Sequence, residues 1–544
     1  MNMIQTRRKK AAVLVLMAVL LLAGAGFRFY DTGRSLYEKI QLFSEILRQI
    51  NRDYVDEKDP TELIDNAIKG MVSGLDPHTT YLSADEFEKW NQSYEGYSGI
   101  GIAFDIIRQK ITVMSVFREG PSDRAGLMPG DRIVAINGKS VVGMKRDDVP
   151  LKLMGPRGSM VTISVERRGW DRLKDFTIVR DEIHVESIPF AFMIKPGIGY
   201  INIDRFSSTT GSELEEKLNK LENLGMRSLI IDLRQNGGGY LDAAVDVVDK
   251  FLPGNRRIVF TQGRISESYR EFFSTAQTTH PMIPVIVLID RISASASEIV
   301  AGALQDWDRA LIVGETSFGK GLVQSQYRFR DGSTLLMTTA KYYTPTGRLI
   351  QRPFDDKSQE EYYTEVWNDS LRQTRDKNIS ENREVFYSKI LNRRVYGGGG
   401  ITPDIFFNTR QDTVSQIVRR MIFHPERLFY TFVEDYLKDP LDSDMELNEF
   451  IKTYHPNGKV RQHFLAHVRK HGFEITDEEY TRNQSLILFM LKQTIANKVW
   501  GDEARYKVQV LRDYPLLESL DYMAAAEQLL AKAYSQTAVA GQSH

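Results

Sequence analysis

The chain has 544 residues, more than a single hydrophobic core accommodates, so we expect several domains. Its formal net charge is −1, which gives no general electrostatic reason to expect nucleic-acid binding. The sequence contains no cysteine, which excludes disulfides, thiolate catalysis, zinc sites of cysteine type and a lipidated N-terminal cysteine.

Residues 1–30 have the pattern of a signal anchor or a signal peptide. Four basic residues at positions 7–10 precede an uncharged apolar run from Ala11 to Phe27. Such a flank favours an N-terminus inside and the following chain outside. About 17 apolar residues just suffice to span a bilayer, although the small residues at 23–26 would also suit cleavage. We predict a membrane-anchored protein whose other domains lie on the extracytoplasmic (periplasmic) side, or secretion into the periplasm if the signal is cleaved.

Residues 31–95 are predicted to form a helical region, because apolar residues recur every three or four positions. The segment Gly74–Leu82 within it is predicted to be a turn between helices. His78 stands in this turn beside a proline and small polar residues, which favours a structural role over a catalytic one.

The order of strands, a short helix and an Asn-Gly hairpin turn over residues 96–188 resembles a PDZ domain. The domain begins with the segment Gly99-Ile100-Gly101-Ile102. By resemblance, the backbone amides of these four residues would hold a peptide C-terminus while the peptide adds a strand to the sheet. The alternative is an ordinary small β-domain that binds nothing.

Residues 189–408 alternate short apolar strands with helices, which predicts an α/β core with crossover connections. The strands are nearly continuous β-branched runs, as expected for strands that are covered on both faces. We predict the strands Gly199–Ile203, Ser228–Asp232, Val285–Ile289 and Leu311–Gly314, and the helices Gly211–Leu224, Ala243–Phe251 and Ser297–Asp306.

Residues 409–544 are predicted to form a helical C-terminal extension that docks as a subdomain, with a coiled-coil or partner-binding role left open. His463 and His467 are expected on a helix surface there. The fold class is therefore α+β multidomain: an N-terminal membrane helix, a helical segment, a PDZ-like β-domain, an α/β core and the extension.

A run of small residues from Ser293 to Ser297 stands directly before a predicted helix. Amides at a helix N-terminus carry positive partial charge, which stabilises a developing oxyanion. Ser295 is the preferred nucleophile of the three serines, because its alanine neighbours leave room for a substrate. The alternative is that these serines only cap the helix.

Lys320 lies in a glycine-bounded turn without the Walker A spacing of a phosphate site. A serine without a histidine partner needs another base, and burial lowers the pKa of a lysine towards neutrality. Gln324 would be about 13 Å from Lys320 along a straight strand. Contact between the two side chains therefore requires local coiling of the segment.

The segment Asp232–Gly239 ends in three glycines after an apolar strand. Glycine lets a backbone amide approach a reacting carbonyl oxygen closely. The alternative is a plain strand-to-helix turn, and the absence of G-x-G-x-x-G in this segment disfavours a nucleotide loop.

Six motifs, in one order, resemble those of the C-terminal processing peptidases (tail-specific proteases, family S41). They are Leu75-Asp76-Pro77, the PDZ-like unit, the Asp-Leu-Arg-x-Asn-x-Gly-Gly turn, the serine run, Gly-Lys-Gly-x-Val-Gln and Ala340–Pro345. The resemblance implies a serine endopeptidase with an α/β peptidase core that recognises protein C-terminal tails and hydrolyses peptide bonds through an acyl-enzyme. It also implies these roles: nucleophile Ser295, general base Lys320, lysine-orienting residue Gln324, and oxyanion donors at the amides of Ala296 and Gly238, or Gly239.

The chain departs from the family pattern at two places. It has Asn236-Gly237-Gly238-Gly239 where members often carry Asn-Pro-Gly-Gly, and Leu153-Met154-Gly155 where many carry Leu-Arg-Gly. If that arginine couples tail binding to activation, this chain lacks it or uses another residue.

Two other functional classes fit parts of this pattern. A catalytically inactive PDZ adaptor on a peptidase fold is disfavoured because Ser295, Lys320 and Gln324 are all retained. An enzyme of acyl-CoA type would leave the PDZ-like unit and Lys320 unexplained. No metal or organic cofactor is expected. The expected partners are protein substrates with exposed C-terminal tails and the membrane, but not nucleic acid; a regulatory partner or a homo-oligomer stays open.

Overall fold

The computed structural model describes residues 36–355, 357–368, 384–407, 414–436, 445–456 and 458–541. The predicted signal anchor or signal peptide, residues 1–30, lies outside the described residues. Within the described ranges, no helix is both long and apolar enough to cross a membrane. The N-terminal membrane helix therefore stays a prediction from the sequence.

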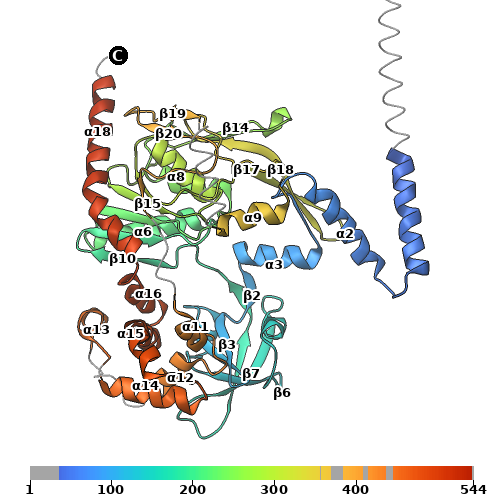
Figure 1. Ribbon diagram of the computed structural model, residues 1–544, viewed down its shortest axis with the longest axis vertical. Coiled ribbons are helices and arrows are strands. Elements are labelled where there is room, and N and C mark those ends of the chain that lie inside the picture. The colour runs from blue at the N-terminus through green and yellow to red at the C-terminus, as the bar shows by residue number, and fades with distance from the viewer. Residues whose placement is uncertain are drawn as a thin grey trace, which may run out of the picture.

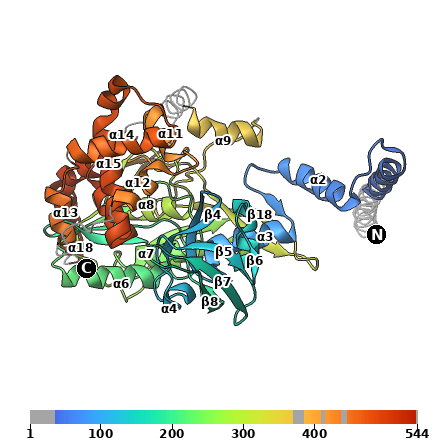
Figure 2. The same ribbon diagram turned by 90° about the horizontal axis from the view of Figure 1, so that it is seen from below.

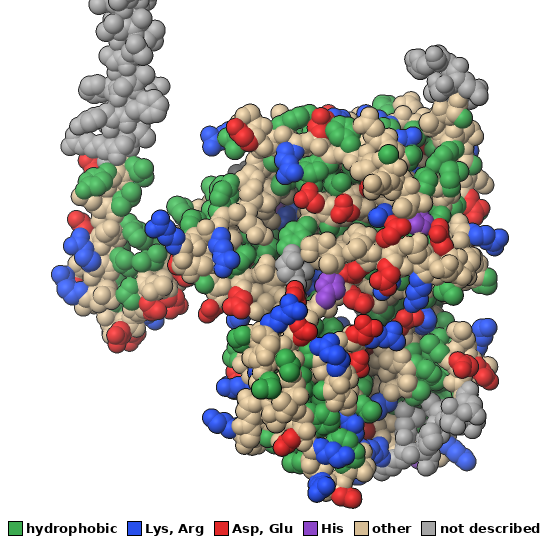
Figure 3. Space-filling view, turned by 180° about the vertical axis from the view of Figure 1, so that it is seen from behind, with side chains coloured by type: hydrophobic (Ala, Val, Ile, Leu, Met, Phe, Trp, Pro, Cys, Tyr) green, Lys and Arg blue, Asp and Glu red, His purple; other side chains and the backbone are tan. Residues whose placement is uncertain are grey.

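A helical arm precedes the main body of the molecule (Figure 1). Large apolar side chains of its first helix, such as Leu36 and Phe43, are exposed. Figure 3 shows green side chains gathered on this arm, where it stands away from the body. The arm consists of a helix over residues 36–53, α2 (Pro60–Ser73) and α3 (Ala84–Glu95).

The segment Gly74–Leu82 is more than the predicted turn, because it ends in a short strand. β1 (Thr80–Leu82) pairs antiparallel with β18 (Thr334–Tyr343). The carboxylate of Asp76 accepts the backbone amide of His78 at 2.8 Å, which closes the turn before the strand. Three residues are too few to show a period of two in the sequence.

The predicted PDZ-like unit is a small β-domain, whose main sheet has the order β3-β4-β5-β7-β8, with β6 on β5. β3 thus lies at one end of this order, and interior side chains such as Ile111 and Ile133 are fully buried. The elements are β2 (Tyr97–Gly99), β3 (Ile102–Ile107), β4 (Lys110–Val116), α4 (Pro121–Arg124), β5 (Arg132–Ile136), β6 (Lys139–Ser140), α5 (Pro150–Leu153), β7 (Met160–Glu166), β8 (Lys174–Val179) and β9 (Asp181–Ile183), which pairs with β2.

The α/β core contains the four predicted strands and the three predicted helices, to within two residues at each end. Its sheet has the order β10-β11-β12-β15-β16-β21, in which the strands from β11 to β21 are parallel and β10 pairs antiparallel with β11. The elements are β10 (Phe190–Lys195), β11 (Ile198–Asn202), α6 (Thr210–Asn223), β12 (Ser228–Asp232), α7 (Leu241–Asp249), β15 (Val285–Ile289), α8 (Ala296–Asp306), β16 (Leu311–Gly314) and β21 (Ile405–Phe406).

Both faces of this sheet are covered, as the apolar strands predict. Leu229 and Ile231 of β12 pack with side chains of α6, α7 and α8. Ile230, between them, points to the other face and packs with Leu516 and Met523 of the C-terminal extension. The period of two along a strand places alternate residues on opposite faces, so the extension forms the second layer over the core.

A second sheet carries the glycine-bounded lysine turn at one end of a strand. β18 pairs with β1, β13 and β17 in this sheet. The strands beside β1 and β18 are β13 (Arg257–Gln262), β14 (Arg270–Phe273) and β17 (Leu322–Arg328). Further along the chain are α9 (Gln359–Trp367), β19 (Val385–Tyr387) and β20 (Arg394–Tyr396).

The C-terminal extension is helical, as predicted, and its position is the same in two views: it lies beside the β-domain and continues along the core as α18 (Figures 1 and 2). Its helices are α11 (Gln416–Ile422), α12 (Leu428–Tyr436), α13 (Leu447–Thr453), α14 (Gly458–Lys470), α15 (Asp477–Trp500), α16 (Asp502–Val510), α17 (Tyr514–Ser519) and α18 (Met523–Gly541).

The expectation that His467 lies on a helix surface is wrong. His463 is exposed, but His467 is buried, and its Nε2 lies 3.0 Å from the hydroxyl of Thr431 on α12. Because α14 packs against α12, one of its faces is covered, and a single histidine carries no period that would reveal this face.

Candidate active site

The nucleophile candidate occupies a strained turn between β15 and α8. Ser295 has φ +56° and ψ −114°, a conformation that costs free energy for a residue with a side chain. The carboxylate of Asp290 supports the turn by accepting the backbone amides of Ile292 and Ser293. The turn leaves Ser295 at the wall of a pocket, directly before the first turn of α8.

The structure separates Ser295 from its two neighbouring serines. The Ser293 hydroxyl donates to the carbonyl of Leu233 at 2.8 Å, and the Ser297 hydroxyl donates to the carbonyl of Asn236 at 3.0 Å. Both serines are fully buried. Of the three, Ser295 is the one that lines the pocket, so Ser293 and Ser297 act as structural supports of the turn.

Lys320 lines the same pocket and contacts Gln324, as predicted. The ammonium Nζ donates to Gln324 Oε1 at 2.9 Å, and the Gln324 amide donates to the backbone carbonyl of His78. The contact does not need the expected helical coiling. Lys320 precedes β17, and a β-bulge between Val323 and Gln324 shifts the strand register, which shortens the separation.

Burial changes the acidity of the groups around Lys320. It lowers the pKa of Lys320 below its ordinary value, although the carboxylates of Glu298 and Asp76 oppose this shift. His78, next to the lysine, has its pKa lowered to about 3 by burial and by the Lys320 charge. His78 is therefore neutral, and its carbonyl holds Gln324, in line with the structural role expected for it.

Glu298 is a site residue that the sequence reasoning missed. Its buried carboxylate accepts two backbone amides at 2.8 Å, that of Ser295 and that of Lys320. It also accepts the amide of Gly319 at 2.7 Å and the hydroxyl of Ser317 at 2.6 Å. Burial raises the pKa of Glu298 to about 7, and these donors limit the rise because they favour the carboxylate. The Ser-x-x-Glu spacing of a capping box was the available signal.

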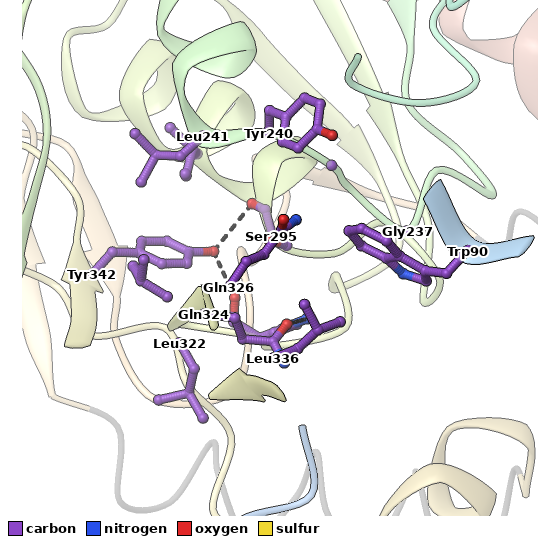
Figure 4. Close-up of a pocket in the computed structure, with 14 residues that line it drawn as sticks. Trp90, Gly237, Tyr240, Leu241, Ser295, Leu322, Gln324, Gln326, Leu336 and Tyr342 are labelled. Atoms are coloured by element: carbon purple, nitrogen blue, oxygen red, sulfur yellow. Dashed lines mark hydrogen bonds between the residues drawn. The ribbon is translucent and has the colours of Figure 1, made fainter. Parts of the chain in front are cut away.

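Tyr342 of β18 also links the serine turn to the lysine turn, through its hydroxyl group. Its hydroxyl lies 3.1 Å from the carbonyl oxygen of Ser295 and 2.7 Å from that of Lys320, and Figure 4 shows it between the two segments. The side chain is fully buried. Glu298 and Tyr342 together fix the serine turn and the lysine turn relative to each other.

The pocket beside Ser295 has a volume of about 210 Å³, and its walls are polar and apolar in about equal measure. Figure 4 shows Trp90, Tyr240, Leu241 and Leu336 around Ser295. Trp90 comes from α3 of the helical arm, so a residue far from the core in sequence completes the wall. Apolar walls beside Ser295, Lys320 and Gln324 suit a peptide, whose side chains are often apolar and whose backbone is polar.

The predicted oxyanion donors lie beside the nucleophile turn. A β-carbon added to Gly238 would lie 2.8 Å from the Ser295 β-carbon, so only glycine fits there. The Gly238 amide donates to the Asn236 side chain at 2.8 Å, whereas Gly239 lines the pocket. Within the described residues, the amides of Ala296 and Gly239 have no acceptor.

The predicted peptide-binding residues lie largely along a second, apolar groove of about 480 Å³. Ile100, Gly101 and Ile102 line it together with Phe104 of β3 and residues of α5. Gly99 does not line the groove; it belongs to β2 and pairs with β9. The lining on the β-domain side also includes Tyr97, Pro150, Leu153 and Met154.

Where many relatives carry Leu-Arg-Gly, Met154 contributes an apolar wall to the groove. A different arginine lies behind this segment. Arg180 is buried and donates to the carbonyls of Leu153 and Lys152, at 2.9 and 3.0 Å. It satisfies the last carbonyls of α5, so its role here is to hold the groove helix.

Comparisons with known proteins agree with this architecture. The profile of peptidase family S41 matches residues 197–355, and that of the PDZ domain matches residues 91–166. The chain is 37% identical, over 323 residues, to the carboxy-terminal-processing protease of Bartonella bacilliformis, covering 58% of this chain and 74% of the relative. The chain belongs to peptidase family S41. It is thus a serine-type peptidase with a PDZ domain, as the motifs predict.

Two further comparisons concern a second relative and a solved structure. The chain is 33% identical, over 329 residues, to the carboxy-terminal processing protease CtpA of Bacillus subtilis, covering 60% of this chain and 69% of the relative. It is similar to the photosystem II D1 C-terminal processing protease at 25% identity with a TM-score of 0.34, covering 68% of this chain and 92% of that one. Residues 424–501 of the S41 chain match a family of unknown function.

Proposed function

We propose that this S41 peptidase is an endopeptidase with a Ser295–Lys320 dyad, which captures protein C-terminal tails with its PDZ domain and cleaves peptide bonds through an acyl-enzyme. The observation that supports the dyad most is the clamp of Glu298 and Tyr342, which holds both residues at one pocket. The hydrogen-bond partner of the lysine, Gln324, is a neutral amide. No carboxylate of the described residues contacts Lys320 Nζ to offset its burial, which favours the neutral amine.

The proposed reaction has two stages. Neutral Lys320 takes the proton of the Ser295 hydroxyl, and Oγ attacks the peptide carbonyl carbon. The amides of Ala296 and Gly239 stabilise the oxyanion, since the expected Gly238 amide already donates to the Asn236 side chain. Each such donor is worth about 10²–10³ in kcat. The Lys320 ammonium then protonates the leaving amine. Lys320 then deprotonates a water molecule, which attacks the ester carbonyl carbon. The C–Oγ bond breaks to release the acid product, and the Lys320 ammonium returns its proton to Ser295 Oγ.

Tail recognition is supported by the apolar groove of the PDZ domain. β3 lies at the end of its sheet and borders the groove, so an extended peptide can add to it as a further strand. The groove walls accept an apolar C-terminal side chain. The names of the two relatives, both carboxy-terminal processing proteases, support the same substrate class.

The sequence supports one further part of the proposal: residues 1–30 anchor the protein so that the peptidase lies on the periplasmic side. The four basic residues before the apolar run support this orientation. Carbonate extraction of membranes, with N-terminal sequencing of the mature protein, distinguishes an anchor from a cleaved signal.

The test of the proposed function is cleavage of an unfolded reporter that ends in an apolar tail. The parent protein is compared with Ser295→Ala and Lys320→Ala. We expect cleavage by the parent and none by either variant. Equal cleavage by all three proteins would show that Ser295 and Lys320 do not form the catalytic dyad. Tail binding without cleavage by the parent would favour the inactive PDZ adaptor.

A further inference from the structure

A buried ion pair joins the C-terminal extension to the peptidase core. The guanidinium of Arg234 donates to Asp513 through Nη1 at 2.9 Å and through Nη2 at 2.7 Å. It also donates to Asp232, through Nε at 2.9 Å and Nη2 at 2.6 Å. The three side chains are at most 9% exposed. The mechanism proposed above uses none of them.

Arg234 belongs to the turn that carries the oxyanion glycines. Two residues further on, the carbonyl of Asn236 accepts the amide of Ala294 at 3.1 Å and the hydroxyl of Ser297 at 3.0 Å. The turn is thus bonded directly to the residues on both sides of Ser295. Because Arg234 is only two residues before Asn236, a displacement of Arg234 would also shift the Asn236 carbonyl that bonds to Ala294 and Ser297.

Asp232 alone does not satisfy the Arg234 side chain. A guanidinium has five N–H donors in a fixed plane, and Asp232 also accepts the hydroxyl of Tyr200 at 2.8 Å. Asp513 is the acceptor that the described part of the chain offers to Nη1. Its loss would leave one end of a largely buried guanidinium without a hydrogen bond to protein, which is costly for a charged group. A cavity of about 850 Å³ borders Arg234 and Asp513, so the guanidinium has room to turn away from its present position.

The extension holds Asp513 firmly. Asp513 is the N-cap of α17 and accepts the amide of Leu516 at 3.1 Å. Leu516 is fully buried on the second face of the core sheet. Tyr506 of α16, which precedes Asp513 in the chain, also packs on the core. Its ring stacks on Phe190 with the centroids 3.9 Å apart, and its hydroxyl lies 2.7 Å from that of Tyr200. Asp513 lies outside residues 197–355 and 424–501, which the S41 and unknown-function families match.

We propose that Asp513 is a positioning residue of the peptidase site. Through Arg234 it holds the Asp232–Gly239 turn in place, and this turn keeps its oxyanion donor at the correct position relative to Ser295. The extension therefore serves the active site as well as covering the sheet. The inference rests on the proposed acyl-enzyme function, because a displaced oxyanion donor matters only if an oxyanion forms.

The test variant is Asp513→Asn, which removes the charge but keeps a good N-cap for α17. Its matched control is Asp502→Asn, the same change at an exposed residue of the extension that pairs only locally with Arg505. Rates of reporter cleavage are expressed per active enzyme, counted by complete labelling of the nucleophile. We expect kcat to fall about tenfold in Asp513→Asn with KM within twofold, because displaced donors weaken transition-state stabilisation without changing substrate binding.

Two further variants separate positioning from general stability. Asp513→Glu keeps the charge and should recover part of the lost kcat. Arg234→Lys is also made alone and together with Asp513→Asn. The double variant should lose no more kcat than the more affected of the two single variants, because both substitutions break the same ion pair. An unchanged kcat per active enzyme in Asp513→Asn, even with a lower Tm, would overturn the inference, as would additive effects of the two changes. Full activity of Ser295→Ala would instead overturn the proposed function itself.

Discussion

The backbone amide of Lys320 donates a 2.8 Å hydrogen bond to Oε2 of Glu298, so a carboxylate from the nucleophile helix holds the loop of the proposed base. This bond places a negative charge near a lysine that must lose its proton to act. Burial lowers the pKa of Lys320, and the charge of Glu298 partly restores it. The pH dependence of the peptidase should therefore change when either Glu298 or Gln324, the hydrogen-bond partner of Lys320 Nζ, is substituted.

Glu298→Gln should shift the rising limb of the kcat/KM profile to lower pH. A general base acts in its neutral form, so activity rises with pH through the pKa of Lys320. The negative charge of Glu298 raises the pKa of Lys320, so Lys320 loses its proton at lower pH when this charge is removed. We also expect a lower maximal kcat, because an amide NH₂ cannot accept all the donors that now meet the carboxylate. An unmoved limb would exclude electrostatic coupling between the two residues.

Gln324→Glu should shift the same limb in the opposite direction. The new carboxylate would lie at hydrogen-bond distance from Lys320 Nζ, where the amide oxygen now lies at 2.9 Å. An opposite charge favours the ammonium and raises its pKa. Gln324→Leu is the control, because it removes the orienting oxygen without adding a charge. It should lower kcat about 10-fold or more with little shift of the limb; an equal shift in both variants would contradict the assignment.

Phe104→Ala should weaken tail binding by about tenfold, since the side chain lines the PDZ groove and loses about 1–2 kcal/mol of apolar contact. Fluorescence anisotropy of a labelled peptide with an apolar C-terminus measures the Kd. Ala103→Ser is the control, because Ala103 is the exposed neighbour on the same strand. Equal Kd values for the two variants would show that tails bind elsewhere.

The sequence predicted the parts of the fold whose signal is local. The strands Val285–Ile289 and Leu311–Gly314 are short apolar runs, and the structure has both with the predicted bounds. The three-residue strand β1 escaped prediction, because its partner lies about 250 residues further along the chain. The contact of Lys320 with Gln324 was predicted, but the β-bulge that brings them together has no signature in the sequence.

The supports of the site were harder to predict than its proposed reactive groups. Ser295 and Lys320 stand in recognisable motifs, whereas Glu298, Tyr342 and Asp513 act through contacts that form only when distant segments fold together. Tyr342 stands within a motif of the family resemblance, yet nothing in the sequence shows that its hydroxyl lies between the two turns. Asp513 stands in a helical segment without any motif, and only the position of α17 on the core brings it to Arg234.

Covalent labelling tests most directly whether Ser295 is a nucleophile that Lys320 activates. The protein is treated with a fluorophosphonate, and the modified peptide and the rate of modification are measured by mass spectrometry. We predict modification at Ser295, none in Ser295→Ala, and a rate at least about 100-fold lower in Lys320→Ala, since a positioned base contributes this much. Modification of another serine, or an equal rate without Lys320, would contradict the claim.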